Sequence, residues 1–298
     1  MLLGADAARL RSRRHDAAAC RPGNRHRSHL PARHLRLRRG RGVALDYSVA
    51  DRDREPRCDR LFHDVYASDA GESGFRSPAA DRYKLTVPAF EAQLDGLWDV
   101  EAQLTFDDGG LSYYTVVADR LEAVGRRGYC FVTTDFIGER GFLSPEQIRE
   151  LDARGHVIGT HSASHPARFS ALTTDEMRDE WSGSRMKLED ILGRAVTVGS
   201  VPGGYFSTAV AKAAADTGLR TLFTSEPTTK ASACEACELI GRFTLRGGHP
   251  PEMARRFAAS APWARCGAWV GWNTKALVKP MLGASYARIA DWILEPNR

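Results

Sequence analysis

Long apolar runs are absent from this sequence. Nowhere in its 298 residues does a stretch approach the ~18 uncharged apolar residues that a membrane-spanning helix needs. The opening four residues are too short for the apolar region of a signal peptide. Cysteine is scarce as well, because six residues in so long a chain cannot form a dense disulfide framework. We therefore expect a soluble, cytoplasmic protein with reduced thiols.

Residues 1–60 contain no Lys, Ile, Phe or Trp, although they hold 16 of the 42 basic residues against 7 acids. Their net charge is +9, whereas the rest of the chain carries −4. A segment of this composition cannot bury a core, so we expect a disordered basic extension or a non-native N-terminus, followed by one folded domain over 61–298. A nucleic-acid surface would place basic residues on the folded part, so nucleic acid is disfavoured as a partner.

From about residue 97, strand and helix signals alternate. We expect strands near 100–106, 129–133, 156–158, 196–198 and 221–223, with helices between them. Ser112 is a candidate helix cap, and Ser144 and Thr173 each begin a capping box. A further short helix is expected after Ser207. Such alternation predicts a parallel sheet, open or closed into a barrel, with its chemistry at the carboxyl ends of the strands.

Polar clusters follow three of these strands. Asp107 and Asp108 end the first, and adjacent strand residues point in opposite directions, so the two carboxylates are expected to do different jobs. His161 and His165 are four residues apart, a usual metal-ligand spacing if the segment is helical. With either aspartate they make the three-ligand set of a catalytic zinc site. A simple Asp-Asp-Gly turn and a chance pair of histidines are the alternatives.

The third cluster contains Pro202, Gly203, Gly204 and Tyr205. Its backbone N–H groups could face an oxyanion, although an ordinary Pro-Gly turn is the simpler interpretation.

Together these segments resemble the polysaccharide deacetylase family, the NodB-homology carbohydrate esterases of family 4. The sequence T-F-D-D-G at 105–109 and H-S-A-S-H at 161–165 match that family's first two motifs. The similarity runs from about residue 61 to the C-terminus. In addition, L-F-H-D-V at 61–65 resembles the Y-H-D-V element of circularly permuted members. The resemblance implies an α/β fold, a distorted (β/α)7 barrel, in agreement with the strand and helix pattern.

The resemblance also implies a role for each motif residue. Asp108, His161 and His165 would hold a divalent metal, Zn²⁺ by ligand type, with Co²⁺ or Ni²⁺ as alternatives. Asp107 would be the general base and His63 the general acid, with His249 as the other candidate for the acid. The loop from Pro202 to Tyr205 would hold the oxyanion. The implied reaction removes N-acetyl groups from an amino-sugar polysaccharide or glycolipid intermediate.

Two departures from the family pattern leave other functions open. Ser200 stands where the family has the arginine that orients the catalytic aspartate. The polar run 53–60 stands where an apolar strand should precede His63, and no buried strand is expected to tolerate it. The alternatives are a catalytically impaired carbohydrate-binding relative and an amidase acting on a small non-sugar amide. The oligomeric state stays open.

Two smaller features have simpler explanations. Cys234 and Cys237 are expected to be free thiols in a loop, since no second pair of ligands accompanies them. The aromatic residues Trp263, Trp269 and Trp272 are expected to pack into the core. Ala276, Leu277, Met281 and Leu282 suggest that the last helix docks against the barrel.

Overall fold

A sheet of nine strands runs through the centre of residues 59–258 and 262–282, the part of the chain that the computed structural model describes. Its order is β11-β1-β4-β5-β6-β7-β8-β10-β9, and every neighbouring pair is parallel except β10 and β9. The strands of this sheet are β1 (Asp59–Phe62), β4 (Leu104–Phe106), β5 (Tyr129–Val132), β6 (Val157–Thr160), β7 (Val198–Ser200), β8 (Thr221–Phe223), β9 (Ser232–Cys234), β10 (Cys237–Ile240) and β11 (Arg242–Thr244). Two further strands, β2 (Val65–Tyr66) and β3 (Leu85–Thr86), pair separately.

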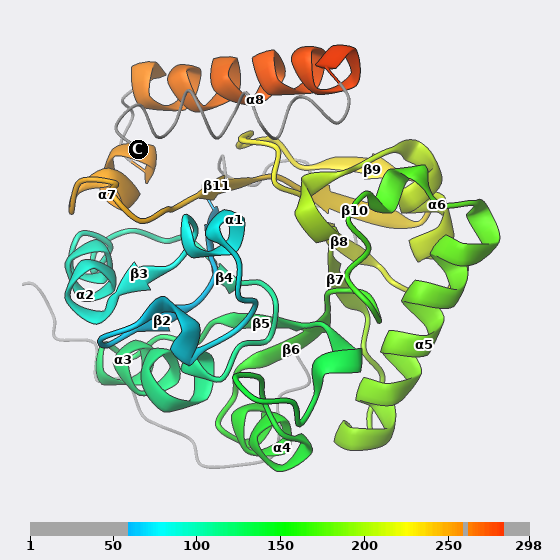
Figure 1. Ribbon diagram of the computed structural model, residues 1–298, viewed down its shortest axis with the longest axis horizontal. Coiled ribbons are helices and arrows are strands. Elements are labelled where there is room, and N and C mark those ends of the chain that lie inside the picture. The colour runs from blue at the N-terminus through cyan, green and yellow to red at the C-terminus, as the bar shows by residue number, and fades with distance from the viewer. Residues whose placement is uncertain (1–58, 259–261, 283–298) are drawn as a thin grey trace, which may run out of the picture. The chain divides into compact units, whose positions relative to one another are not determined.

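One kinked strand closes the sheet into a barrel. Only Gly241 separates β10 from β11, yet β10 pairs with β8 and β11 pairs with β1 at the other end of the strand order. A Cβ atom at Gly241 would lie 2.5 Å from the backbone oxygen of Glu226, so glycine is required at the kink. Counting β10 and β11 as one strand gives seven barrel positions (Figure 1). The expected distorted (β/α)7 barrel is confirmed.

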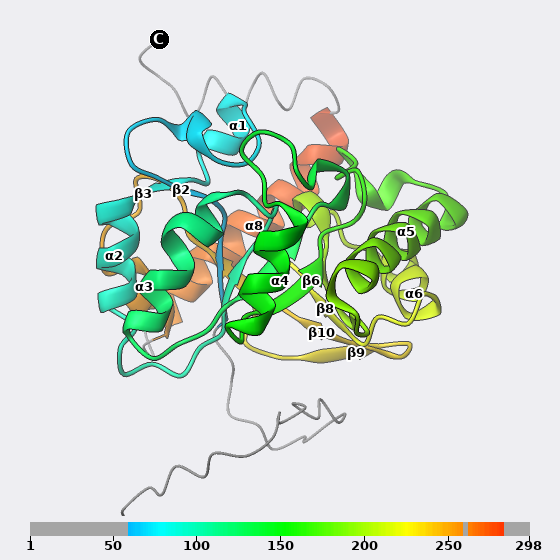
Figure 2. The ribbon, with the colours of Figure 1, turned by 90° about the horizontal axis from the view of Figure 1, so that it is seen from below.

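Helices surround these strands, and α4 lies over β6 in both views (Figures 1 and 2). The α-helices are α1 (Pro78–Asp81), α2 (Val87–Asp95), α3 (Ala118–Ala123), α4 (Pro145–Ala153), α5 (Thr174–Leu192), α6 (Thr208–Asp216), α7 (Met253–Ala258) and α8 (Pro262–Leu282). The shorter turns are η1 (Ala70–Glu72), η2 (Tyr113–Val117), η3 (Thr134–Phe136), η4 (Phe169–Ala171) and η5 (Pro202–Gly204). Within the described ranges, every helix is too short or too polar to span a bilayer.

The capping signals in the sequence set most helix starts. Ser144 and Thr173 form the expected capping boxes at α4 and α5, and Ser207 caps α6. Ser112 does not act as a cap. Its Oγ donates to Asp64 Oδ1 at 2.8 Å and accepts the Val65 N–H at 3.0 Å, so the chain enters α3 through the π-helical turn η2.

Aromatic side chains fill the barrel interior. The Phe223 ring lies 5.3 Å from the Tyr129 ring and 5.1 Å from the Phe131 ring. Because β5 and β8 are not neighbours in the sheet, these contacts cross the barrel. A larger apolar core, which includes Phe62, Phe106 and Leu121, packs the sheet against α2, α3 and α4.

The expectation that the polar run 53–60 excludes a buried strand is wrong for its last two residues. Asp59 and Arg60 begin β1 and are 1% and 0% exposed. Asp59 Oδ1 accepts the Gln103 N–H at 3.0 Å, and Arg60 Nε donates to the Ala254 carbonyl at 2.9 Å. Burial of polar groups is tolerated when hydrogen bonds replace water. Residues 1–58 lie outside the described part, so the division into 1–60 and 61–298 stays a prediction.

Two expectations about α8 have different outcomes. Trp263 and Trp269 are 63% and 51% exposed, so their expected core packing is wrong. Trp272 is half-buried, and a Cβ atom on Gly204 would lie 2.7 Å from its ring. The predicted docking through Ala276, Leu277, Met281 and Leu282 concerns side chains outside the described ones.

Candidate active site

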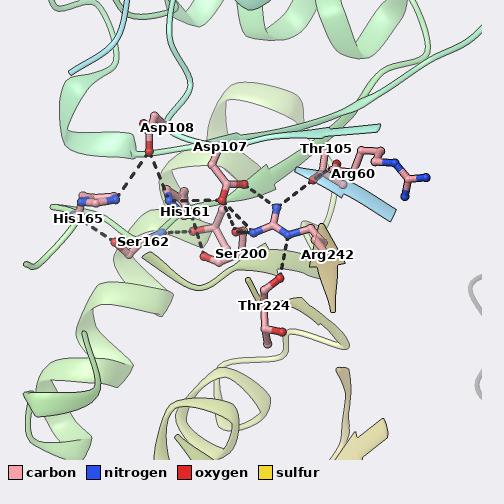
Figure 3. Close-up of polar contacts among 11 residues, drawn as sticks. Arg60, Thr105, Asp107, Asp108, His161, Ser162, His165, Ser200, Thr224 and Arg242 are labelled. Carbon is pink, nitrogen blue, oxygen red and sulfur yellow. Dashed lines mark hydrogen bonds and ion pairs between the residues drawn. The ribbon is translucent and has the colours of Figure 1, made fainter. Parts of the chain in front are cut away.

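Three segments that are distant in sequence meet at the carboxyl ends of β4, β6 and β7, and the side chain of Arg242 joins them from β11 (Figure 3). Asp107 and Asp108 follow β4, and the segment 161–165 follows β6. Ser200 ends β7, and Arg242 begins β11 at the kink that closes the barrel. The structure thus brings together the first two sequence clusters and adds an arginine that the motif analysis did not identify.

Asp108, His161 and His165 form a cluster with metal-ligand geometry. Asp108 Oδ1 lies 3.5 Å from His161 Nε2 and 3.7 Å from His165 Nε2. All three ligand atoms lie within 4.8 Å of one another, and no second group of this kind occurs in the described ranges. Ligands bound at ~2.1 Å around a tetrahedral centre are roughly 3.4 Å apart. The donor set and its spacing therefore fit a divalent cation.

The segment carrying the two histidines is a turn and not a helix, so helical spacing is not what brings the two side chains together. Ser162 and His165 have φ values of 66° and 56°, in the left-handed region. Thr160 Oγ1 accepts the Ser162 N–H, and Ser162 Oγ accepts the His165 N–H, both at 3.1 Å. Glu180 on α5 accepts the Ala163 N–H at 2.9 Å. These hydrogen bonds stabilise a turn that places the two imidazole rings 5.1 Å apart.

The protonation states of the two imidazoles suit metal binding. Burial lowers the pKa of His161 to about 3 and also lowers the pKa of His165, so both imidazoles are neutral near pH 7. His161 Nδ1 lies 2.9 Å from the Ser200 carbonyl oxygen, which assigns the proton to Nδ1 and leaves Nε2 toward Asp108. Burial raises the pKa of Asp108 well above its usual range, and the charges of Asp64 and Asp107 add to that effect.

Asp107 is held by an arginine from another strand. Arg242 Nη1 donates to Asp107 Oδ1 at 2.8 Å and Nη2 donates to Oδ2 at 2.9 Å, a two-pronged ion pair between buried groups. Arg242 Nη2 also donates to Ser200 Oγ at 2.8 Å, and that hydroxyl donates to Asp107 Oδ2 at 3.0 Å. The expectation that the orienting group is missing is therefore wrong. Ser200, at the position where the family has its arginine, contacts Asp107 through a hydroxyl, and Arg242 reaches the same carboxylate from β11.

Arg242 is itself fixed on all sides. Nη1 donates to Thr105 Oγ1 and Nε donates to the Thr224 carbonyl, both at 3.0 Å. The guanidinium lies 5.7 Å from the ring centres of both Phe131 and Phe223. Burial raises the pKa of Asp107, but the charge of Arg242, with His161 and the Arg242 hydrogen bonds, outweighs burial and holds that pKa below its ordinary value. Asp107 is therefore ionised at neutral pH.

The two candidate acid histidines lie in different surroundings. His63 follows β1, and its ring lies 4.9 Å from the Tyr83 ring. Burial lowers the pKa of His63 to about 4, and Asp107, Arg242 and His165 all act on it electrostatically. Burial also lowers the pKa of His249, but the charge that acts on this residue is Arg246, and its ring packs 6.5 Å from Phe257. His63 is thus the histidine in the electric field of the Asp107 cluster.

The predicted oxyanion loop forms the turn η5 directly after β7. Gly203 and Gly204 adopt φ values of 60° and 68°, where glycine is favoured. The Trp272 ring covers Gly204, so α8 reaches this loop. Cys234 and Cys237 are free thiols opposite each other in the β9–β10 hairpin.

The fold and the site together define an α/β-barrel protein with a candidate metal centre of the catalytic type at its strand ends. Residues 100–222 match the family model for polysaccharide deacetylase. Over this segment the resemblance to the polysaccharide deacetylase family that the motifs indicated is confirmed.

Named relatives agree with this assignment. Peptidoglycan-N-acetylmuramic acid deacetylase PdaA from Bacillus subtilis is 33% identical over 124 residues, which cover 41% of this chain and 45% of that protein. Peptidoglycan-N-acetylglucosamine deacetylase from Bacillus cereus is 33% identical over 95 residues, which cover 32% of this chain and 31% of that protein. The chain thus spans less than half the length of these curated relatives.

Solved structures support the fold. The Streptococcus pyogenes deacetylase PplD in complex with acetate has a TM-score of 0.53 at 18% identity, covering 66% of this chain and 95% of that one. At this level of identity the likeness concerns the barrel alone.

Proposed function

We propose that this chain is a metal-dependent hydrolase that removes N-acetyl groups from an amino-sugar polysaccharide or glycolipid intermediate. One observation carries the proposal: the buried, arginine-held carboxylate of Asp107 lies beside the ligand set of Asp108, His161 and His165, with Asp107 Oδ2 3.9 Å from His161 Nε2. An ionised base next to a three-ligand metal set is the arrangement that amide hydrolysis needs. The deacetylase names of the relatives point to acetylated amino sugars as the substrate class.

Asp108, His161 and His165 would hold the cation. Two neutral imidazoles and a carboxylate suit Zn²⁺, and Co²⁺ or Ni²⁺ would also fit. When bound, such an ion supplies a Lewis acid that acidifies water and polarises a carbonyl group.

Asp107 acts as the general base. It is ionised at neutral pH, and Arg242 and Ser200 hold both of its oxygens, so it accepts the proton of the attacking water without first reorienting. A positioned base of this kind contributes roughly 10²–10⁴-fold in rate.

His63 acts as the general acid. Burial keeps its imidazole neutral in the resting site, with a pKa of about 4. Negative charge that develops on the substrate during attack raises that pKa again, so His63 can take up a proton from solvent water in the substrate complex and pass it to the departing amine. The backbone N–H of Gly203 would hold the developing oxyanion, with the rest of the loop, Pro202, Gly204 and Tyr205, against the substrate.

Acetate release tests the proposal directly. Zinc-loaded protein should release acetate from N-acetylglucosamine oligomers or peptidoglycan fragments, and His161→Ala should lose both the metal and the activity. Asp107→Asn should keep the metal and lose turnover, whereas Asp108→Asn should bind metal weakly and regain part of its turnover at high metal concentration.

The contrary outcomes are equally clear. Turnover of simple amides alone would make the protein a small-amide amidase. Sugar binding without turnover in any condition would make it a carbohydrate-binding relative. A metal-free Asp107→Asn protein beside a metal-loaded, inactive Asp108→Asn protein would reverse the two aspartate roles.

A further inference from the structure

Residues 161–165, the histidine turn, adopt a backbone conformation that depends on neighbouring segments. Ser162 and His165 have φ values of 66° and 56°, in the left-handed region that residues other than glycine rarely adopt. The Ser162 hydroxyl accepts the His165 N–H within the turn (Figure 3). Such conformations persist only where the surrounding structure holds them. The position of the metal ligand His165 therefore depends on the contacts that hold this turn.

One carboxylate from outside the turn accepts several of these hydrogen bonds. Glu180 lies on α5, and its Oε2 accepts the N–H groups of Ala163 and Ser164, both at 2.9 Å. Its Oε1 accepts the Ser164 hydroxyl at 2.6 Å. Both carboxylate oxygens thus bind the two residues midway between His161 and His165. Hydrogen bonds to a charged acceptor are stronger than those to a neutral one, so Glu180 is well suited to hold the turn.

Two further residues support the turn from the same face of α5. Glu180, Ser184 and Lys187 are four and three positions apart, a spacing that places them on one side of a helix. The buried Ser184 hydroxyl lies 2.6 Å from Thr160 Oγ1, the oxygen that also accepts a backbone N–H of the histidine turn. Lys187 Nζ donates to the Thr134 carbonyl at 2.7 Å, and the Thr134 N–H donates to a carbonyl of the same turn at 3.2 Å.

The helix that carries these residues is anchored independently of the turn. Met177, Trp181 and Leu188 of α5 are buried, and the Trp181 ring lies 4.8 Å from the Phe169 ring. A capping box at Thr173 fixes the start of the helix. Apolar packing and capping therefore hold α5 in place, and loss of the Glu180 carboxylate is expected to loosen the turn while the helix remains folded.

We infer that Glu180 is a positioning residue for the metal ligands, assisted by Ser184 and Lys187 from the same face of α5. The inference rests on the proposed function, because it concerns the metal site that this function needs, and it adds a residue that lies outside the three motif segments. Glu180 holds the turn in its left-handed conformation before a cation arrives, which reduces the ordering cost of binding. Residues that orient metal ligands typically contribute about 10–100-fold in metal affinity.

Metal affinity in two variants tests the inference. Zinc affinity of the full-length protein is measured by competition with a chelating dye, and the visible spectrum of the cobalt-loaded protein reports the ligand geometry. Glu180→Ala should weaken zinc binding about 10–100-fold and change the cobalt spectrum. Glu180→Gln keeps an oxygen that can accept the backbone N–H groups, so its zinc affinity should lie between those of Glu180→Ala and the wild type.

Glu189→Ala is the matched control. Glu189 also lies on α5, and its Oε1 accepts the Val196 N–H at 2.9 Å and the Arg185 Nε–H at 2.8 Å. Its removal thus costs hydrogen bonds of the same kinds at a site away from the histidine turn. Urea denaturation of the metal-free proteins should show a loss of stability in both alanine variants, whereas zinc affinity should fall only in Glu180→Ala.

Three results would overturn the inference. Unchanged zinc affinity in Glu180→Ala would remove its basis, and an equal loss in Glu189→Ala would show a general effect of a weakened α5. An equal loss in Glu180→Gln and Glu180→Ala would show that the charge alone acts on the cation. Wild-type protein that binds zinc but releases no acetate fails the proposed function and leaves the affinity comparison decisive for Glu180. Wild-type protein that binds no divalent cation contradicts both.

Discussion

Replacing Arg242 with methionine should destabilise the protein and disable its base while leaving the metal in place. The substitution keeps a long side chain but removes both bonds to the Asp107 carboxylate, together with those to Ser200, Thr105 and Thr224. Asp107 would then be a buried charge without its partner. Removal of one member of a buried ion pair costs about 3–5 kcal/mol, a large part of the ~5–15 kcal/mol that holds a domain folded.

The pH dependence of the free energy of unfolding gives a second measure of the Asp107–Arg242 ion pair. In the wild type, Arg242 holds the pKa of Asp107 below its unfolded value, so the ion pair stabilises the fold above about pH 4 and the stabilisation is lost as the pH falls further. In Arg242→Met the pKa of Asp107 rises, and protonation relieves the penalty in acid. The stability difference between the two proteins should therefore be largest near pH 7 and should shrink toward pH 3.

Urea denaturation, monitored by tryptophan fluorescence, measures the stability difference between the wild type and Arg242→Met. Acetate release measures turnover, and metal analysis measures the bound metal. Turnover should fall roughly 10²–10⁴-fold with the metal retained.

Arg120→Met is the matched control, because its ion pair with Glu91 is half-exposed and should contribute at most about 1 kcal/mol. The double variant Ser200→Arg/Arg242→Ser, which moves the arginine to the family's usual strand, should recover part of both losses. Unchanged stability and turnover in Arg242→Met would refute this account of the site.

Four further predictions concern other parts of the chain. Metal affinity should fall about tenfold per pH unit below the raised pKa of Asp108, because metal binding displaces one proton from that carboxyl group. Titration calorimetry in buffers of different pH measures how the affinity depends on pH, and a pH-independent affinity would contradict the prediction. Deletion of residues 1–58 should leave cooperative melting and acetate release intact, whereas loss of cooperative melting would show that the segment belongs to the fold. His63→Ala should reduce kcat by roughly 10²–10⁴-fold while His249→Ala retains most of it, and the reverse order would assign the acid to His249. Gly241→Ala should lower the melting temperature through a loss of about 1–3 kcal/mol, because its Cβ meets the Glu226 carbonyl, and an unchanged melting temperature would show that the kink can relax.

Local signals in the sequence were sufficient to predict the alternating strands and helices and to bring the two aspartates and two histidines to one edge of the sheet, whereas closure into a barrel and the choice of Asp108 as third ligand came from the family resemblance. Capping boxes at Ser144 and Thr173 mark helix starts, and strand ends place Asp108 and His161 at the same edge of the sheet. Arg242 could not be found in this way. Its partner lies 135 positions away, and the contact exists only because the strand kinks at Gly241 and closes the barrel. The available signal for Arg242 was its position in the sequence, a lone arginine directly after Gly241 at the end of an apolar strand.

The same reasoning explains why the burial of Asp59 and Arg60 was not anticipated. Charged residues normally argue against a central strand, and only the distant partners Gln103 and Ala254 reverse that argument. The cavity of about 470 Å³ that Phe75 and Phe136 line beside His165 is beyond sequence analysis for a related reason. Its walls come from two loops, around residues 75 and 136, whose proximity depends on the hydrogen bonds of Lys84 and Gly74.

The kinked strand also has a consequence for the order of folding. Closure pairs Asp59 with Arg242, residues about 180 positions apart, and contacts of such separation form late because the entropy of a long loop must first be overcome. Arg242 reaches Asp107 only in that last step. A chain with its central strands assembled but its barrel open would therefore already contain the Asp108, His161 and His165 ligands, yet its base would lack a partner. Such an intermediate would capture metal before it could hydrolyse anything, and metal uptake should precede the recovery of activity during refolding.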